Sequence, residues 1–149
     1  MRVLSVRAAR PEDAPALADL CAAHAAYEGL DYQAAGHAQR LHAALHRGRL
    51  HAWLALQDET AVGYVSVTLD FATLSAQPFL HMDCLYLAPE ARGQGRGHAL
   101  MQVAQAFGKA QGCSTMQWQT PNWNQAALQF YERAGAKGLA KQRYTLALY

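Results

Sequence analysis

Apolar residues recur along the chain with two different periods, which alternate in a mixed order. Alternating or continuously apolar runs are typical of strands and predict six of them, over residues 2–8, 50–56, 61–69, 79–87, 114–119 and 142–148. Helical spacing predicts four helices: one from Pro11 to a break at Gly29, one over residues 34–46, one that starts within the glycines at 93–97 and ends near Gly108 or Gly112, and one between Asn124 and Gly135. The predicted order is β-α-α-β-β-β-α-β-α-β, an α/β (α+β mixed sheet) fold with an antiparallel first half and later strand–helix–strand crossovers.

Length and composition limit the classes of protein to which this chain can belong. With 149 residues, 52% hydrophobic and 16% charged, it is expected to form one domain, residues 1–149, with its own core. No apolar run approaches the length of a membrane span, and residues 1–6 lack the features of a signal peptide, so we expect a cytoplasmic protein. The three cysteines have no paired spacing, and a net charge of +2 gives no nucleic-acid footprint, so the predicted partners are small molecules.

The segment over residues 85–98 joins a predicted strand to a predicted helix through three glycines. Gly93, Gly95 and Gly97 alternate with Gln94 and Arg96, so successive backbone N–H groups can approach a ligand without β-carbons between them. Those N–H groups and the positive end of the helix dipole form a concavity that suits phosphate. The turn is therefore predicted to bind an anion.

Three known phosphate-binding motifs contain glycines in such a turn, and the sequence matches one of them better than the other two. A Walker-type loop ends in Gly-Lys-Ser/Thr, whereas this turn ends in Gly97-His98. A dinucleotide fingerprint has the spacing Gly-x-Gly-x-x-Gly after the first strand, whereas here the spacing is Gly-x-Gly-x-Gly and the turn comes late in the chain. The third motif, the Arg/Gln-x-x-Gly-x-Gly/Ala loop that holds the pyrophosphate of coenzyme A, is matched by residues 92–97.

A second motif follows downstream of this loop. It has Asn124, then Ala127 three residues on, Tyr131 seven on and Gly135 eleven on. Together with the glycine loop and the order of elements, it resembles the GNAT superfamily of acetyl-CoA-dependent N-acetyltransferases over essentially the whole chain. Within that superfamily, the pattern looks like the branch that includes the diamine (spermidine/spermine-type) acetyltransferases.

The resemblance implies a binding site for acetyl-CoA as cosubstrate. A main-chain N–H near Leu85 is expected to polarise the thioester carbonyl, and Tyr86 and Leu87 are expected to pair with the pantetheine arm as a strand would. Asn124 resembles the residue that contacts the cofactor arm, although it could simply cap its helix. The other predicted cofactor contacts are Arg92, Gly93, Gln94, Gly95, Arg96, Gly97 and His98.

Acetyl transfer to an amine needs a group that takes the amine proton and a group that protonates the departing sulfur. An alkylamine is mostly protonated at pH 7, as the reference pKa of lysine near ~10.4 illustrates. Asp83 occupies the position where similar acetyltransferases have a Glu or Asp base and is the predicted base, directly or through water, while Tyr131 is the predicted acid. Glu28, Asp31 and Asp70 are alternative carboxylates, and Glu28 with Asp83 is expected to attract a cationic substrate.

Histidines offer weaker candidates. His81 lies two residues before Asp83, so on a regular strand the two side chains share a face and a proton relay is conceivable, although packing is the preferred interpretation. His42 and His46 are one helical turn apart but have no third ligand nearby in the sequence, so no metal site is predicted.

The predicted function is transfer of acetyl from acetyl-CoA to a primary amine of a small polyamine-like or amino-acid-like molecule, by direct attack in a ternary complex. Acetylation of aminoglycosides, or of peptides or proteins, uses the same core with a different rim and stays an alternative. A non-catalytic CoA-binding sensor module is the alternative from another class. A homodimer is plausible because the family often pairs through its C-terminal strands, and residues 144–149 are apolar enough to need cover.

Overall fold

The computed structural model of the protein describes residues 4–149, so positions 2 and 3 of the first predicted strand lie outside the described residues. The chain forms two compact units, one that runs to Trp118 and one over Gln119–Tyr149, and each is described by itself. The larger unit holds the sheet and three α-helices, and the smaller unit holds one α-helix.

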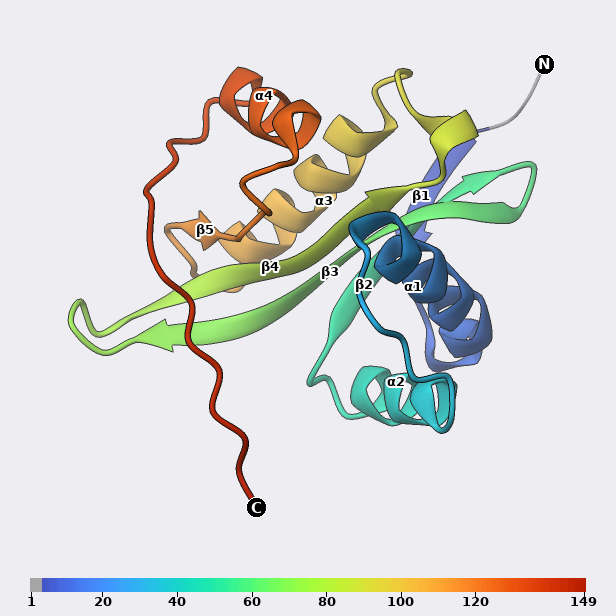
Figure 1. Ribbon diagram of the computed structural model, residues 1–149, viewed down its shortest axis with the longest axis horizontal. Coiled ribbons are helices and arrows are strands. Elements are labelled where there is room, and N and C mark those ends of the chain that lie inside the picture. The colour runs from blue at the N-terminus through green and yellow to red at the C-terminus, as the bar shows by residue number, and fades with distance from the viewer. Residues whose placement is uncertain (1–3) are drawn as a thin grey trace. The chain divides into compact units, whose positions relative to one another are not determined.

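The larger unit is built on a five-stranded sheet in the order β1-β2-β3-β4-β5 (Figure 1). Its strands are β1 (Leu4–Ala8), β2 (His51–Gln57), β3 (Thr60–Ala72), β4 (Gln77–Leu87) and β5 (Met116–Gln117). The first four strands pair antiparallel, whereas β5 returns through a helical crossover and pairs parallel with β4. The predicted mixed α/β architecture is therefore present.

Two of the three α-helices of this unit follow a strand, and a short 3-10 turn lies between the strand and the helix in each case. The first turn, Pro11–Asp13, leads into α1 (Ala14–Glu28), which is followed by α2 (His37–His46). The second, Pro89–Ala91, is separated from α3 (Arg96–Ala110) by the glycine loop. Among residues 4–149, none of the helices is long and apolar enough to cross a membrane.

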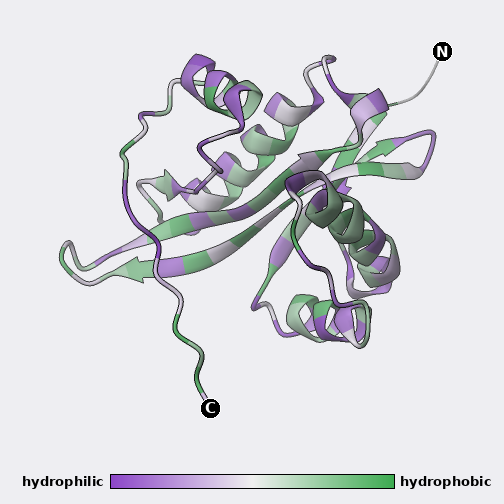
Figure 2. Cartoon of the chain, in the orientation of Figure 1, coloured by the Kyte–Doolittle hydropathy of each residue, from purple (hydrophilic) through white to green (hydrophobic). Residues whose placement is uncertain are grey.

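The helices cover both faces of the sheet, as the alternation along β2 shows. Ala52 and Leu54 belong to the same buried cluster as Leu17 of α1, whereas His51 and Trp53 contact the ring of Phe107 on α3. Successive side chains of a strand point to opposite faces, so α1 and α3 lie on opposite sides of the sheet. Figure 2 shows the apolar positions concentrated along the central strands and the helix surfaces that cover them.

A β-bulge interrupts the pairing of β3 with β4. Ser66 is opposite Cys84 and the next residue, Val67, is opposite Met82, so Asp83 is an extra residue with no partner across the ladder. Such a bulge bends its strand and redirects the side chains that follow. The carboxylate predicted to act as a base is thus the inserted residue itself.

The bulge inverts the alternation of β4. Leu80 lies against Gly108 of α3, whereas Tyr86, six residues later, belongs to the buried cluster on the α1 face. On a regular strand, residues separated by an even number would share a face. The predicted sharing of a face by His81 and Asp83 rested on that regular alternation, which the bulge breaks.

The smaller unit contains α4 (Gln125–Arg133). The Asn124 side-chain oxygen accepts a hydrogen bond from the Ala127 N–H at 3.1 Å, so Asn124 caps the helix. After the helix, Gly135 has φ +92°, the left-handed conformation that commonly ends a helix. The predicted boundaries of this helix are confirmed.

The strand predicted over residues 142–148 is wrong, because residues 136–149 have no regular secondary structure. Tyr144, Leu146 and Leu148 are 89%, 84% and 91% exposed. Alternating apolar residues indicate which side chains would share a face, but a strand also needs a neighbour for its N–H and C=O groups. The strand predicted over residues 114–119 is likewise reduced to the two residues of β5, which pair with Leu80 and His81.

Candidate active site

The glycine loop between β4 and α3 has the backbone geometry expected of an anion site. Gly93 and Gly95 have φ of +81° and +76°, and Gly95 is the residue that precedes the first turn of α3. Apart from the adjoining residues, the described part of the chain has no heavy atom within 4 Å of where a Cβ would stand at either glycine, so this side of the loop is open. The first N–H groups of a helix have no intrahelical acceptor and attract anions. The loop therefore fits the pyrophosphate of coenzyme A in chemistry and in access.

Arg96 lies inside the protein instead of on the surface of this loop. Its side chain donates to the Ala91 carbonyl at 3.0 Å and to Gln94 Oε1 at 2.8 Å, and the residue is 7% exposed. Its Nε is buried without a hydrogen-bond partner among the described residues. In this position Arg96 stabilises the loop from the interior of the protein through Ala91 and Gln94. Its predicted contact with phosphate stays a prediction.

Arg92 lies on the other side of the loop and is exposed. Its Nε donates to the Leu87 carbonyl at 2.9 Å, and its guanidinium lies 4.7 Å from the ring centre of Tyr27 and 5.7 Å from that of Tyr86. These contacts fix the cation beside the end of β4. The arrangement links the loop to the C-terminal end of α1.

One edge of β4 lacks a strand partner where the cofactor arm is predicted to bind. β5 pairs with Leu80 and His81, and in the described part of the chain no strand continues along the same edge from Met82 to Leu87. On the other edge, Leu85 and Tyr86 pair with β3. An extended amide-containing ligand can add to such an open edge as a further strand.

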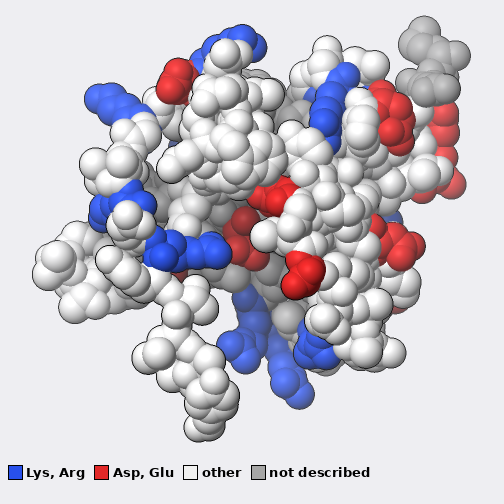
Figure 3. All heavy atoms as spheres, in the orientation of Figure 1, with Lys and Arg blue, Asp and Glu red and all other residues white. Residues whose placement is uncertain are grey.

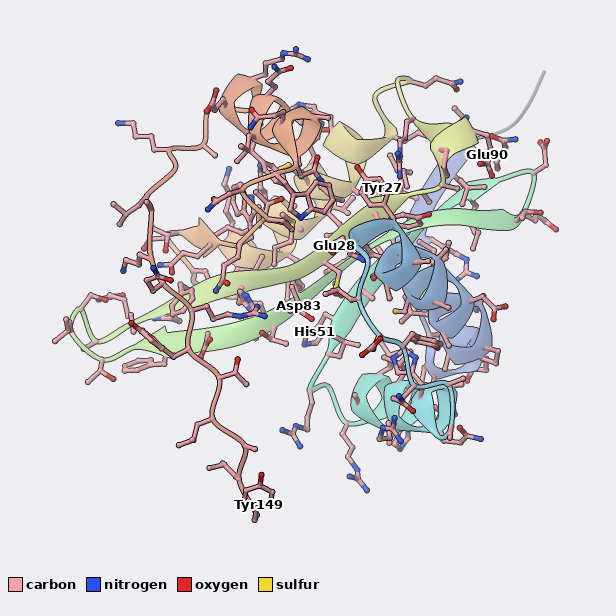
Figure 4. The ribbon with its side chains drawn as sticks, viewed as in Figure 1. Tyr27, Glu28, His51, Asp83, Glu90 and Tyr149 are labelled. Carbon is pink, nitrogen blue, oxygen red and sulfur yellow. The ribbon has the colours of Figure 1, made fainter. Side chains whose placement is uncertain are left out.

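A pocket of about 390 Å³ opens on the α1 face of the sheet. Its acidic members are Glu28, Asp31 and Asp83, and among the described residues that line it there is no Lys or Arg. Figure 3 shows acidic side chains close together near the centre of the view, and Figure 4 labels Glu28 at the end of α1 and Asp83 on β4, which both line this pocket. The pocket therefore offers a negative environment that suits a cation.

The pocket wall includes His24 and Tyr64, which the sequence did not predict as site residues, next to Glu28, which it did. His24 Nδ1 lies 2.8 Å from the Tyr64 hydroxyl, and His24 Nε2 lies 3.0 Å from Glu28 Oε2. The His24 ring also stacks on Tyr86, with 5.0 Å between ring centres. The spacing of His24 and Glu28, one helical turn apart, was the one signal in the sequence that could have drawn attention to the pair.

Two thiols near the Tyr64 hydroxyl are held in the protonated form. Burial raises the pKa of Cys84 to about 11 and also raises the pKa of Cys21. Burial likewise raises the pKa of Tyr64, so its hydroxyl is neutral. The thiolate is the nucleophilic form of cysteine, so neither thiol is activated at neutral pH.

The structure brings some predicted residues together and leaves others apart. Asp83, Glu28 and Asp31 line one pocket, whereas Asp70 lies on the exposed far part of β3 opposite Phe79. Tyr131 lies on α4 in the smaller unit, with its ring 5.5 Å from that of Phe130. Among residues 4–149, no group of three or more His, Cys, Asp or Glu is placed to hold a metal ion.

Comparison with known proteins identifies the family. The family model described as "Acetyltransferase (GNAT) family" matches residues 17–136. A thialysine N-epsilon-acetyltransferase from Caenorhabditis elegans is 22% identical over 141 residues, which are 95% of this chain and 88% of that protein.

Two solved structures with the same fold are named as acetyltransferases. A probable acetyltransferase has a TM-score of 0.84 at 24% identity and covers 97% of this chain and 98% of its own. An aminoglycoside N-acetyltransferase in complex with CoA has a TM-score of 0.84 at 15% identity, over 99% of this chain and 96% of its own. The chain therefore belongs to the GNAT family and is an acetyl-CoA-dependent acetyltransferase.

Proposed function

We propose that this protein transfers the acetyl group of acetyl-CoA to a primary amine of a small molecule. The observation that carries this proposal is the pocket on the α1 face, which is lined by Glu28, Asp31 and Asp83 and by neither Lys nor Arg within residues 4–149. An ammonium ion is attracted to such a group of carboxylates before it is deprotonated. The amine then attacks the thioester directly, with both substrates bound.

Asp83 is the proposed base and Tyr131 the proposed acid. The bulge at Asp83 directs an exposed carboxylate into the pocket, where it can accept a proton from the amine directly or through water. The hydroxyl of Tyr131 gives a proton to the departing sulfur. Glu28 acts with Asp83 to hold the ammonium.

The proposed cofactor contacts follow from the loop and the open edge of β4. The backbone N–H groups of residues 93–98 and the side chain of Arg92 take the pyrophosphate, while Leu85, Tyr86 and Leu87 face the pantetheine arm. Support for the pyrophosphate contact comes from the left-handed φ of Gly93 and Gly95 and from the open space beside these two glycines. Asn124 serves as a cap in the smaller unit, and its contact with the cofactor arm is part of the proposal.

An amine panel with detection of the free CoA thiol tests this function. Polyamines, free amino acids, aminoglycosides and lysine peptides are each incubated with acetyl-CoA, and turnover is expected with small diamines or amino acids. Acetyl-CoA binding by calorimetry without thiol release across the whole panel would instead support a non-catalytic CoA-binding module. Turnover confined to peptides would contradict the small-molecule acceptor.

The finer choice of acceptor has two candidates. The thialysine acetyltransferase relative is named for an amino acid with a side-chain amine, in keeping with the diamine-type branch that the sequence resembles. Aminoglycosides are the second candidate, because solved structures of the same fold include aminoglycoside acetyltransferases. The pocket volume of about 390 Å³ favours the smaller acceptor.

Homodimerisation and a cytoplasmic location also stay proposals, as does a single functional domain over residues 1–149. The exposed apolar side chains of residues 144–149 are consistent with a segment that a second copy covers. Light scattering of the purified protein checks the oligomeric state, and a monomer at micromolar concentration would contradict the dimer.

A further inference from the structure

His24 lies at the junction of three elements, and every polar atom of its ring has a partner. It belongs to α1, its hydroxyl partner Tyr64 to β3, and its stacking partner Tyr86 to β4. Its side chain is 15% exposed and lines the pocket beside Glu28, whose side chain is 19% exposed. The ring is thus fixed in orientation but still open to the pocket.

The partners determine which ring nitrogen carries the proton. Glu28 is an acceptor, so His24 Nε2 carries a hydrogen and donates it to Glu28 Oε2 at 3.0 Å. Nδ1 then has a lone pair, and the Tyr64 hydroxyl donates to it at 2.8 Å. This is the tautomer in which a carboxylate holds one nitrogen of a histidine while the other nitrogen is a base.

Charged groups on every neighbouring element affect this imidazole. Burial lowers its pKa, whereas the carboxylates of Glu28 on α1 and Asp83 on β4 raise it, and the guanidinium of Arg92 after β4 lowers it. Tyr64 on β3 and Tyr86 on β4 face the ring with their aromatic rings, at 5.8 and 5.0 Å between ring centres. The lowered pKa favours the neutral imidazole, and the carboxylates of Glu28 and Asp83 stabilise a proton that is added to it.

We propose that His24 is the final acceptor of the proton that the amine loses, reached through the hydroxyl of Tyr64. This inference rests on the proposed function, because it concerns the amine acceptor of that reaction. An N–H bond of the bound ammonium breaks and its electron pair stays on nitrogen. The proton passes through Asp83 or a pocket water to the Tyr64 oxygen, while the Tyr64 proton moves to His24 Nδ1. No tyrosinate forms, and the imidazolium returns its proton to solvent after turnover.

An acceptor beyond Asp83 has a chemical reason. Proton transfer is most effective when the pKa of the acceptor lies near the working pH, and the reference pKa of an imidazole, ~6.5, is closer to neutral pH than that of a carboxylic acid, ~4. The imidazole of His24, oriented by the Tyr64 hydroxyl and the Glu28 carboxylate, can hold the proton for the time that the amine needs to attack. The carboxylate of Asp83 then attracts the ammonium and passes the proton on.

Two substitutions test this role while they preserve the fold. His24→Gln keeps a donor toward Glu28, and His24→Asn keeps an acceptor toward Tyr64, but neither side chain titrates. Both are expected to lower kcat/KM at pH 7 by about 100-fold, the lower end of the usual contribution of a general base. Exposed His42 on α2, changed to Gln, is the matched control and is expected to keep wild-type activity.

The pH profile separates a proton acceptor from a packing residue. Wild-type kcat/KM is expected to fall on the acid side with a pKa below 6.5, and this limb is expected to be absent from both His24 variants. Their activity rises toward wild type as the pH approaches the pKa of the amine, where free amine is abundant. Asp83→Asn keeps the acid limb but moves it to lower pH, because one carboxylate that raises the pKa of His24 is gone.

A weakly basic amine gives a second readout. An amine substrate whose pKa lies below 6 is already neutral at pH 7 and needs no base. With this substrate His24→Gln is therefore expected to lower kcat/KM by less than about tenfold. Tyr64→Phe should resemble His24→Gln with a strongly basic amine, because the relay lacks its hydroxyl. An equal loss with both amines would overturn the proposal and leave His24 a packing residue.

The outcomes for this inference and for the proposed function are distinct. Wild-type turnover together with unchanged kcat/KM in His24→Gln would overturn the inference and leave the proposed function standing. Lack of thiol release by the wild-type protein with every amine would overturn both. NMR titration of the wild-type histidines covers the case of unfolded variants: a His24 pKa that differs from the acid limb of kcat/KM overturns the proposal, and a match supports it.

Discussion

The glycine loop and the acidic pocket carry the two halves of the proposed reaction, and they are built in opposite ways. The loop is a run of neighbouring residues, 92–97, that offers mainly backbone N–H groups, and the side chains of Gln94 and Arg96 hold its shape. The pocket joins side chains from distant parts of the chain, such as His24, Tyr64 and Asp83. Backbone conformation should therefore matter most in the loop, and side-chain chemistry most in the pocket. Substitutions in each region can test this contrast.

Asp83→Asn should have the largest effect, because it removes a charge from the pocket and leaves the backbone unchanged. We expect kcat/KM for the amine to fall about 100-fold at pH 7 and the loss to shrink at higher pH, where the amine needs no base. Steady-state kinetics over pH 6 to 10 measure this, with the Kd of acetyl-CoA as the control. An unchanged pH profile would place the base elsewhere.

Tyr131→Phe tests the proposed acid, which lies in the smaller unit and belongs to neither the loop nor the pocket. Loss of the hydroxyl should lower kcat by at least about tenfold, because the thiolate must leave without a proton donor. The Kd of acetyl-CoA, measured by calorimetry, should change little. Wild-type turnover in this variant would refute the assignment of Tyr131 as the acid.

Gly95→Ala tests the loop through its backbone. A left-handed φ of +76° costs an alanine about 1 to 2 kcal/mol, so the loop shifts and the Kd of acetyl-CoA should rise about tenfold, with the KM of the amine unchanged. Gly112→Ala is the matched control, since Gly112 has φ +85° and open space around it but lies at the other end of α3. Equal cofactor affinity in the two variants would break the proposed contrast.

Asp13→Asn should have the smallest effect and should leave the kinetics of both regions intact. The bidentate contact with Arg7, at 2.7 and 2.9 Å, lowers the pKa of Asp13 to about 2, so the unfolded chain binds the proton more tightly. The stability contribution, about 1 kcal/mol after solvent screening, is present above pH 4 and lost as the pH falls toward 2. Urea unfolding at pH 7 and pH 2 measures it. A destabilisation of equal size at both pH values would argue against the ion pair.

The same contrast explains what the sequence predicted well. The loop, its helix and the cap at Asn124 depend on residues within one turn of each other, so spacing alone predicted them. Glycine, capping and helical periodicity act locally, and their signals survive without knowledge of the rest of the fold. The roles of Asp83 and Tyr131 came from resemblance to a family and stay predictions.

The features that the sequence did not predict depend on contacts between distant residues. His24 meets Tyr64 only because α1 packs across β3, forty residues further along the chain. The bulge is set by pairing between two strands, and nothing in the residues around Asp83 indicates an insertion. The wrong strand over residues 142–148 has the same origin, because alternation does not say whether a partner strand is available.

The bulge also makes two kinds of mutation at one position unequal. Substitution of Asp83 changes a charge, whereas deletion of Asp83 would restore a continuous ladder from Met82 into Cys84. In the restored ladder Cys84 would follow Met82 directly, so the pairs Ser66–Cys84 and Val67–Met82 would be kept and Tyr86 would stay on the α1 face. Deletion would therefore remove the pocket carboxylate and the local bend of β4 together, whereas Asp83→Asn removes the charge alone, so the difference between the two variants measures what the bend itself contributes.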